Sequence, residues 1–341
     1  MIDALVLLLM VGVAGYVGYV LYGGSQPAPV NELQTIGSIL AKSAQHQKLG
    51  GSYRDADGDL VADAPSDADQ LQKVDVLGFC LVAGDDPSKA QEEWADFLQA
   101  LEKATGKKVN YRGDLESQEA KLAALRDGTL HVTAFSTGEV PVAVNAAGFV
   151  PLASPSDAEG RNSYEMEILV PAGSTCRSPA DLKGKTVAFT VMSSNSGAKA
   201  PLIILKDKFQ LLPGRDYQHV MTGGHQRSIR GLAAGKYNAV CVANDMLASS
   251  VAAGEIQPDQ FRSIYKSGSF PPLCLGVAHD LPPEVIAQLK QVLQDFRFEG
   301  TSLAKRFGPQ GKTQFAPVNY KHDWAYVREI NDALARLADS Q

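Results

Sequence analysis

Two short runs of small polar residues carry the groups with which this chain could hold an anion. The first run is SSNSG, whose members are Ser193, Ser194, Asn195, Ser196 and Gly197. The second run is TGGH, which begins at Thr222 and ends at His225. Backbone N–H groups at a helix N-terminus, together with the positive end of the helix dipole, bind anions without a side-chain cation. The two runs predict a site for a small anion if each one precedes a helix.

The elements around both runs have the order that such a site needs. Residues 186–190 (TVAFT) predict a strand before the first run, and a helix is expected from about Ala198. Residues 219–222 predict a second strand, and residues 228–234 a helix that ends at Gly235. Apolar residues 239–243 predict the next strand. Two successive strand-loop-helix units therefore place two helix N-termini side by side.

The preceding part of the chain has the same rhythm. Apolar stretches at 74–83, 108–112 and 130–135 predict strands, and amphipathic helices separate them. This βαβαβ order is typical of a mostly parallel sheet with crossover helices. Ligands of such sheets bind at the carboxyl ends of the strands, where Ser136 and Thr137 are expected.

Length and charge limit the classes of function. A chain of 341 residues with 45% hydrophobic residues can bury a large core, and its length favours two lobes. Its net charge is −6 and no block of basic residues occurs. Because phosphate-backbone binding needs clustered Lys and Arg, a nucleic-acid partner is disfavoured.

The N-terminus predicts a membrane segment. Residues 4–22 (ALVLLLMVGVAGYVGYVLY) contain no charge, and their number is close to the roughly 20 that cross a bilayer. A cleavable signal would carry a basic start and a small-x-small cleavage site. Here the only charged side chain before the apolar stretch is Asp3, and the GGSQPAP that follows fits such a cleavage site poorly. Residues 1–23 are therefore interpreted as an uncleaved transmembrane anchor. The alternative is a buried core helix.

An acidic stretch lies in the tether expected at residues 24–73. Asp55, Asp57 and Asp59 occupy alternate positions on a turn-prone segment, and Asp63 follows four residues later. Such spacing can converge on Ca²⁺, as in calcium loops with ligands at positions one, three and five. It departs from the EF-hand pattern and is more similar to a single thrombospondin- or dockerin-type repeat. The alternative is a solvated acidic linker.

Three longer runs resemble one known family. They are TGKKVNYRGDLESQEAKLAALRDGTLHVTAF, SPADLKGKTVAFTVMSSNSGAKAPLIIL and TGGHQRSIRGLAAGKYNAVCVAND. Together they resemble the phosphate-, phosphite- and phosphonate-binding (PhnD-like) substrate-binding proteins of ABC transporters, roughly over residues 74–307. SSNSG before Pro201 is similar to that family's S-T-S-G-x-x-x-P anion loop, and GGH is similar to its G-S-H turn.

The resemblance implies an α/β fold of two lobes, the type II periplasmic-binding-protein fold. The apolar stretch at residues 4–22 adds an N-terminal transmembrane helix to this fold. Lobe 1 would comprise residues 74–163 and 269–341, and lobe 2 residues 164–268. Tyr164 would lie in the first crossing segment. Lobe 2 would hold the ligand through the first run, Thr222 and His225, and lobe 1 through Ser136 and Thr137. Tyr164 is the tenth candidate ligand residue.

The same comparison bears on the ligand. Where the family often has an acidic residue for an aminoalkyl group, this chain has Ala243, with Asn244 and Asp245 just beyond. Phosphite, phosphate or a methyl-substituted phosphonate is therefore favoured over an aminoalkylphosphonate.

Each site residue also has a purely structural interpretation. Serines before helices are frequently N-caps. Thr222 could cap the Gly223 turn, His225 could be a capping or core residue, and Tyr164 could be only a hinge residue. The four cysteines have no metal-binding spacing; they are Cys80, Cys176, Cys241 and Cys274. They could form disulfides or remain buried free thiols.

Two functions follow from different classes. The chain lacks a G-x-S-x-G elbow, a Walker loop, a G-x-G-x-x-G run and an H-E-x-x-H motif, so an enzyme is disfavoured. In the first function, a membrane-anchored, extracytoplasmic receptor closes on an oxyanion and delivers it to an ABC permease. In the second, the binding fold is a structural or sensory subunit of another membrane complex. No cofactor is expected apart from Ca²⁺ at the tether.

Overall fold

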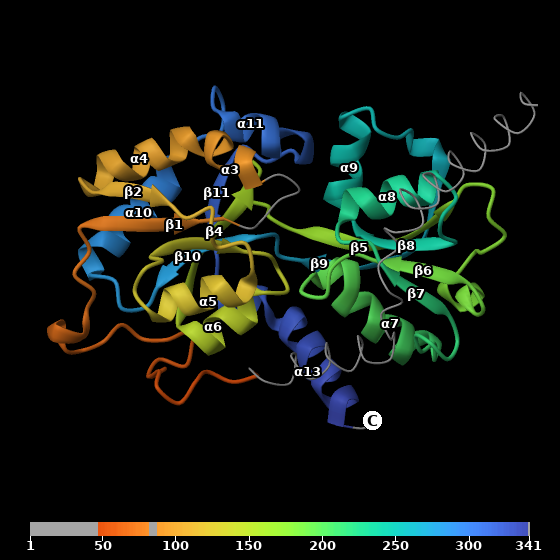
Figure 1. Ribbon diagram of the computed structural model, residues 1–341, viewed down its shortest axis with the longest axis horizontal. Helices are drawn as coiled ribbons and strands as arrows, with labels where there is room; N and C mark the ends of the chain where they lie inside the picture. Colours follow the sequence, from red (N-terminus) through yellow and green to blue (C-terminus); the bar gives the residue numbers. More distant parts are fainter. Residues whose placement is uncertain (1–46, 82–86, 340–341) are drawn as a thin grey trace, which may run out of the picture. The chain divides into compact units, whose positions relative to one another are not determined.

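The computed structural model describes residues 47–81 and 87–339. The expected anchor at residues 1–23 and the first half of the tether lie outside this range. Within the described residues, none of the helices combines the length and the apolar character that a bilayer crossing requires. These residues form two α/β lobes, each built around one sheet with helices on both faces (Figure 1).

Lobe 1 contains a six-stranded sheet whose strands come from both ends of the described chain. Their order across the sheet is β11 (Gln314–Pro317), β4 (Phe149–Ser156), β10 (Cys274–Ala278), β3 (Val132–Phe135), β1 (Val76–Cys80) and β2 (Lys108–Tyr111). Strand β1 pairs in parallel with β2 and β3, whereas β10 runs antiparallel to β3 and β4. The parallel core predicted from the βαβαβ order is therefore bordered by antiparallel returns.

Lobe 1 helices cover both faces of this sheet. They are α3 (Pro87–Glu93), α4 (Ala95–Thr105), α5 (Gln118–Arg126), α6 (Val140–Ala147), α10 (Pro283–Asp295) and α11 (Ser302–Phe307), with the short 3₁₀ turns η1 (Ala68–Gln70) and η5 (Gly308–Gln310). Ser117 begins α5 by accepting from the N–H of Ala120, and Gly106 ends α4 in the left-handed conformation. Trp94 and Phe97 pack on each other and on Phe315, so these aromatics form core, as expected.

Lobe 2 contains a five-stranded sheet drawn from one continuous stretch of chain. Its order is β7 (Gln218–Met221), β6 (Thr186–Phe189), β8 (Ala239–Ala243), β5 (Tyr164–Pro171) and β9 (Phe261–Phe270). Strand β6 pairs in parallel with β7 and β8, and β5 runs antiparallel to β8 and β9. The parallel strands end at one edge, which is where the two polar runs follow.

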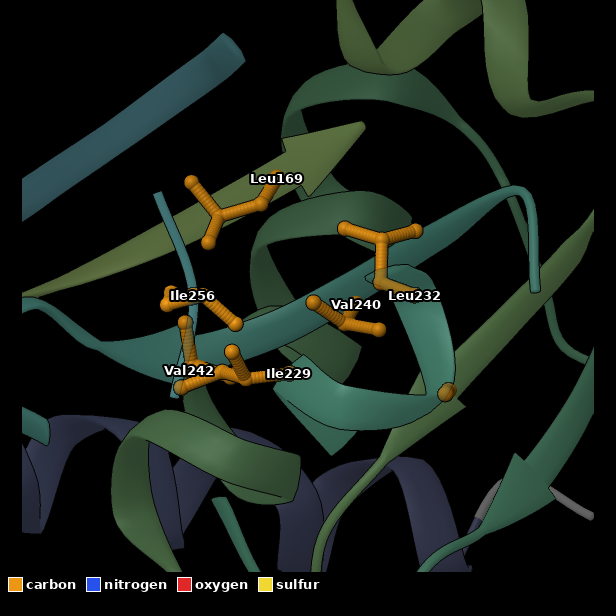
Figure 2. Packing of buried hydrophobic residues seen from close by; sticks show 7 residues of the cluster. Leu169, Ile229, Leu232, Val240, Val242 and Ile256 are labelled. Carbon is orange, nitrogen blue, oxygen red and sulfur yellow. The ribbon is translucent and has the colours of Figure 1, made fainter. Parts of the chain in front are cut away.

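Lobe 2 helices position those runs. They are α7 (Ala200–Phe209), α8 (His225–Ala233) and α9 (Asn244–Ala252), with the 3₁₀ turns η2 (Pro179–Leu182) and η4 (Pro258–Gln260) and a π-helical turn η3 (Asn195–Lys199). Ile229 and Leu232 of α8 pack against Val240 and Val242 of β8 (Figure 2). This apolar contact fixes the start of α8 relative to the sheet.

Two helices differ from their expected starts. Helix α7 begins at Ala200 rather than near Ala198, because the preceding residues form the π turn. Helix α8 begins at His225 rather than at Ser228, so His225 occupies its first turn.

Two segments cross between the sheets, and a third element contacts both lobes. The crossings join β4 to β5 and β9 to β10. After β11 the chain forms α12 (Tyr320–Asp323) and α13 (Ala325–Asp339). Helix α13 packs against α7 and η3 of lobe 2. Directly before it, the indole of Trp324 donates to the carbonyl of Thr137 in lobe 1 at 3.0 Å.

Residues 47–73 contact lobe 1 although they contain only one short 3₁₀ turn. The N–H of Gly50 donates to the carbonyl of Asn145, and Gln72 bonds to Asp280 through both its backbone and its side chain. Val61 and Ala62 are buried.

All four cysteines are buried free thiols. Burial raises the pKa of Cys274 to about 12 and also raises the pKa of Cys80 and of Cys241. The open question of disulfides is thereby answered in favour of buried thiols.

Candidate anion-binding cleft

The first polar run forms a tight turn at the end of β6. The hydroxyl of Ser194 accepts from the N–H of Gly197 at 3.0 Å, and the carbonyl of Ser194 accepts from the N–H of Lys199 at 3.1 Å. The second bond spans five residues, which is the π-helical spacing found frequently at functional sites. A Cβ atom at Gly197 would overlap the Thr190 hydroxyl. Glycine is therefore required where the turn meets the end of the strand.

The second polar run forms the turn that begins α8. Gly223 has a φ of +85°, which favours glycine. The hydroxyl of Thr222 lies 2.6 Å from that of Ser228 and 3.1 Å from the carbonyls of Phe189 and Gly224. These contacts fit the capping interpretation of Thr222.

His225 connects the two runs. Its Nδ1 accepts from the N–H of Ala243 at 3.3 Å, so the proton of the neutral ring lies on Nε2. That Nε2 lies 3.4 Å from the hydroxyl oxygen of Ser194. Burial lowers the pKa of His225 to about 4, so the ring is neutral at pH 7. His225 therefore presents one N–H donor next to the first polar run, residues 193–197, which we call the serine loop.

The lobe 1 residues Ser136 and Thr137 follow β3. The backbone N–H and the hydroxyl of Ser136 both donate to Glu139, at 3.0 and 2.8 Å. The hydroxyl of Thr137 donates to the carbonyl of Pro271 at 2.7 Å, in the second crossing segment. Thr137 thus ties the end of β3 to a crossing, whereas Ser136 begins α6 with Glu139 as its partner.

Tyr164 begins the crossing strand β5 and is buried. Its hydroxyl lies 3.5 Å from the side-chain nitrogen of Asn195, and it also hydrogen-bonds Thr137 and Ser196. Burial is the main cause that raises its pKa. The side-chain oxygen of Asn195 is buried and has no hydrogen-bond partner within the described residues. Tyr164 therefore joins Thr137 of lobe 1 to Asn195 and Ser196 of the first polar run.

These residues surround one cleft of about 1120 Å³ between the sheets. Eight of the ten predicted ligand-binding residues line it, and these are Ser136, Thr137, Tyr164, Ser193, Ser194, Asn195, Ser196 and His225. Gly197 and Thr222 do not line it and instead form hydrogen bonds within the two turns. Whether the eight residues bind a ligand remains a prediction.

The cleft also contains charged residues that the motifs did not indicate. They include Lys121, Glu139, Lys199, Arg227, Asp245 and Lys312, together with the ion pair Glu93–Arg306. Asp245 follows β8, and burial raises its pKa. Its place at the carboxyl end of a parallel strand was a usable signal in the sequence. No local sequence pattern indicated that Lys199 and Lys312 line the cleft.

The acidic stretch forms a separate turn in residues 47–73. Asp55, Asp57 and Asp59 each place one carboxylate oxygen within 4.8 Å of the others. Asp57 accepts from the N–H of Asp59, and Asp63 accepts from the N–H of Ala56. Three of the four predicted ligands therefore converge, while Asp63 braces the turn.

Comparison with known proteins identifies the family. The family described as "ABC transporter, phosphonate, periplasmic substrate-binding protein" matches residues 79–324. The chain belongs to this family. It is a substrate-binding protein of an ABC phosphonate/phosphate transporter, and the family consists of periplasmic binding proteins rather than enzymes.

Individual members of the phosphonate-binding family agree. A phosphate-import protein PhnD of Mycolicibacterium smegmatis is 26% identical over 253 residues, which cover 68% of this chain and 77% of that protein. PhnD1 of Prochlorococcus marinus, solved with methylphosphonate, superposes with a TM-score of 0.64 at 14% identity, over 76% of this chain and 98% of that one. A binding-protein component of an ABC phosphonate transporter of Pseudomonas aeruginosa has a TM-score of 0.58 at 17% identity, over 79% of this chain and 95% of that one. These structures confirm the two-lobe type II fold.

Proposed function

We propose that this family member is a membrane-anchored receptor that clamps one small oxyanion between its lobes for uptake by an ABC permease. The ligand is phosphite, phosphate or a small phosphonate. The observation that supports this most is that the first polar run, His225 beside it and the end of β3 line one cleft between the lobes, where the hydroxyl proton of Ser194 is left for a further partner. Oriented hydroxyls and helix N-terminal amides hold anions without a paired cation. The phosphate and methylphosphonate in the names of two relatives agree with this chemistry.

Thermal unfolding of the full chain in detergent tests the proposal. Phosphate, phosphite, methylphosphonate, aminoethylphosphonate, sulfate and carbonate are compared at equal concentration. A ligand at 100 times its Kd adds about 2.7 kcal/mol to the free energy of unfolding, so the true anion raises the melting temperature measurably. A shift with phosphorus oxyanions alone supports the receptor. No shift with any anion, in a well-folded protein, contradicts the receptor and favours the structural or sensory subunit.

The anchor is the second part of the proposal. Residues 4–22 are uncharged and close in number to a membrane-spanning helix. The expected result is that the expressed chain stays with the membrane fraction after an alkaline carbonate wash, and that deletion of residues 1–23 releases it. Release of the intact chain by the wash would contradict an anchor.

Calcium at the acidic turn is the third part. One oxygen of Asp55 is buried without a hydrogen-bond partner in the described residues, and the pKa of Asp59 is raised by desolvation and by its acidic neighbours. A hard cation would relieve both. Calorimetric titration with CaCl₂ is expected to show one site that Asp57→Asn removes and Asp69→Asn, outside the cluster, leaves intact. No heat at millimolar Ca²⁺ would make the turn a solvated acidic linker.

A further inference from the structure

Lys199 is a buried cation at the junction of the two lobes. Only 5% of the Lys199 residue is exposed to solvent. Its ammonium donates to the carbonyl of Gly138 in lobe 1 at 2.7 Å. No carboxylate forms an ion pair with it within residues 47–81 and 87–339, and Glu139 acts on it only through space. Lysine is almost never buried without such a partner, so this placement calls for a specific reason.

The π turn explains how Lys199 reaches the other lobe. The N–H of Lys199 closes the five-residue turn at Ser194, so the backbone that presents the serine loop also sets the direction of the lysine side chain. An ordinary α-helical turn would rotate Lys199 away from this direction by changing the number of residues per turn. Loop geometry and lysine placement are therefore linked.

Gly138 brings lobe 1 into direct contact with the same loop. A Cβ atom at Gly138 would overlap the carbonyl of Ser193 and lie 2.9 Å from the backbone nitrogen of Asn195. The backbones of the two lobes thus touch beside the anion loop, and the lysine bond holds them at that point.

The far side of Lys199 faces a small polar cavity. The cavity measures about 20 Å³ and is also lined by Asn145, Arg328, Asn331 and Asp332. The side-chain oxygen of Asn331 is buried and lacks a partner within the described residues. This volume suits one water molecule. A water there would join the remaining ammonium donors to α13, so that Lys199 would be held from both lobes and from the C-terminal helix.

We propose that Lys199 is a positioning residue for ligand capture: it fixes the serine loop against Gly138 of lobe 1 and does not itself contact the anion. The inference rests on the proposed oxyanion-binding function of the cleft. Without the bond, fewer molecules hold the loop and lobe 1 in the arrangement that binds, and the apparent affinity falls by that fraction.

The test uses Lys199→Met, which keeps the length and loses the donor, and Gly138→Ala, which pushes the lobes apart and keeps the lysine. Lys206→Met is the matched control, because Lys206 lies on the outer side of α7 and, among the described residues, its ammonium pairs only with Asp207. Calorimetry with methylphosphonate and with phosphate gives the affinity. Hydrogen exchange of the ligand-free proteins reports the order of residues 193–200 and 136–142.

A charge-assisted hydrogen bond corresponds to about 10- to 100-fold in affinity, and this loss is expected for both anions with Lys199→Met. Hydrogen exchange in both segments is expected to become faster in Lys199→Met. Gly138→Ala is expected to show the same loss of affinity and the same faster exchange, and Lys206→Met is expected to resemble the wild type. Unchanged affinity and exchange in Lys199→Met would overturn the proposal. Weaker binding with unchanged exchange would also overturn it, because the ammonium would then act on the anion itself.

The two proposals can fail separately. If the wild type binds none of the anions, the proposed function fails. The exchange measurement still decides whether Lys199 orders the two segments, because it needs no ligand.

Discussion

At the scale of single residues, Ser194 combines a structural and a binding role. Its hydroxyl oxygen accepts from the N–H of Gly197 and lies 3.4 Å from Nε2 of His225. Both neighbours are donors, because Nδ1 of His225 is occupied as an acceptor. The hydroxyl proton of Ser194 is thus left for a third partner, and Ser194 lines the cleft. The N-cap interpretation and the binding interpretation of this serine are compatible.

Ser194→Ala is expected to weaken both properties. Loss of the cap lowers the free energy of unfolding by about 1 kcal/mol, and loss of a donor to an anion lowers affinity by about 10-fold or more. Urea unfolding and calorimetry measure the two effects. Asn319→Ala, which removes the cap of α12 outside the cleft, is expected to cost stability alone. Equal anion affinity in Ser194→Ala and the wild type would remove Ser194 from the binding site.

His225 predicts a dependence of stability on pH. Its pKa falls from 6.5 to about 4 through burial, so between these values the unfolded chain binds a proton that the folded chain does not. Stability is therefore lost as pH falls from about 6.5 to about 4, with a slope of at most ~1.4 kcal/mol per pH unit from this group. His225→Gln is expected to be flatter over that range in urea unfolding. A bound anion raises the pKa of His225, so anion affinity is expected to increase as pH falls. Identical profiles of stability against pH in the wild type and in His225→Gln would exclude this role of His225.

At the scale of elements, the π turn decides how the serine loop faces the cleft. Gly197 packs on Thr190 where β6 ends, and its carbonyl accepts from the N–H of Thr190 at 2.9 Å. The side-chain hydroxyl of Thr190 is buried without a partner in the described chain. There is thus no space in which the turn could relax.

Gly197→Ala is expected to displace the turn and lower the free energy of unfolding by about 1–3 kcal/mol, which is typical of overpacking. Anion affinity is expected to fall with it. Gly173→Ala is the control, because a Cβ atom at Gly173 meets nothing within 4 Å. Unfolding and calorimetry check both variants, and a Gly197→Ala protein with wild-type stability would show that the turn has room to adjust.

The sequence indicated these elements better than it indicated their contacts. The order of strands and helices and the two polar loops were readable because apolar period, caps and glycines are local signals, as Ser117 and Gly106 show. The π turn was not readable, because it differs from an α-helical start by one hydrogen bond. Lys199 was also missed, since its burial depends on Gly138, which lies 61 residues earlier in the chain.

At the scale of the whole molecule, α13 extends the connection between the lobes. The chain leaves lobe 1 at Trp324, whose indole bonds to Thr137, and α13 then packs on α7 and η3 of lobe 2. Tyr326 stacks on Phe270 at the end of β9, with ring centroids 5.0 Å apart. The lobes are thus joined by two crossing segments and by the C-terminal segment, which contacts lobe 1 through Trp324 and lobe 2 through α13.

Trp324→Phe is expected to weaken this junction. The indole N–H is lost and the carbonyl of Thr137 remains buried, so the free energy of unfolding falls by about 1–3 kcal/mol. Tyr326→Phe keeps the stacked ring and serves as the control. Chemical unfolding measures both, and equal stability of the two variants would show that the indole bond contributes nothing.

The burial of all four thiols has a practical consequence for following ligand entry in real time. Thiol-directed dyes react with accessible thiolates, and these cysteines are buried, three of them with a raised pKa. A single new cysteine could be labelled without removing any of them. Val191 lines the cleft and is 41% exposed, so a fluorophore on Val191→Cys would sit beside the serine loop. The native chain is in this respect already a scaffold for an optical sensor of its own ligand.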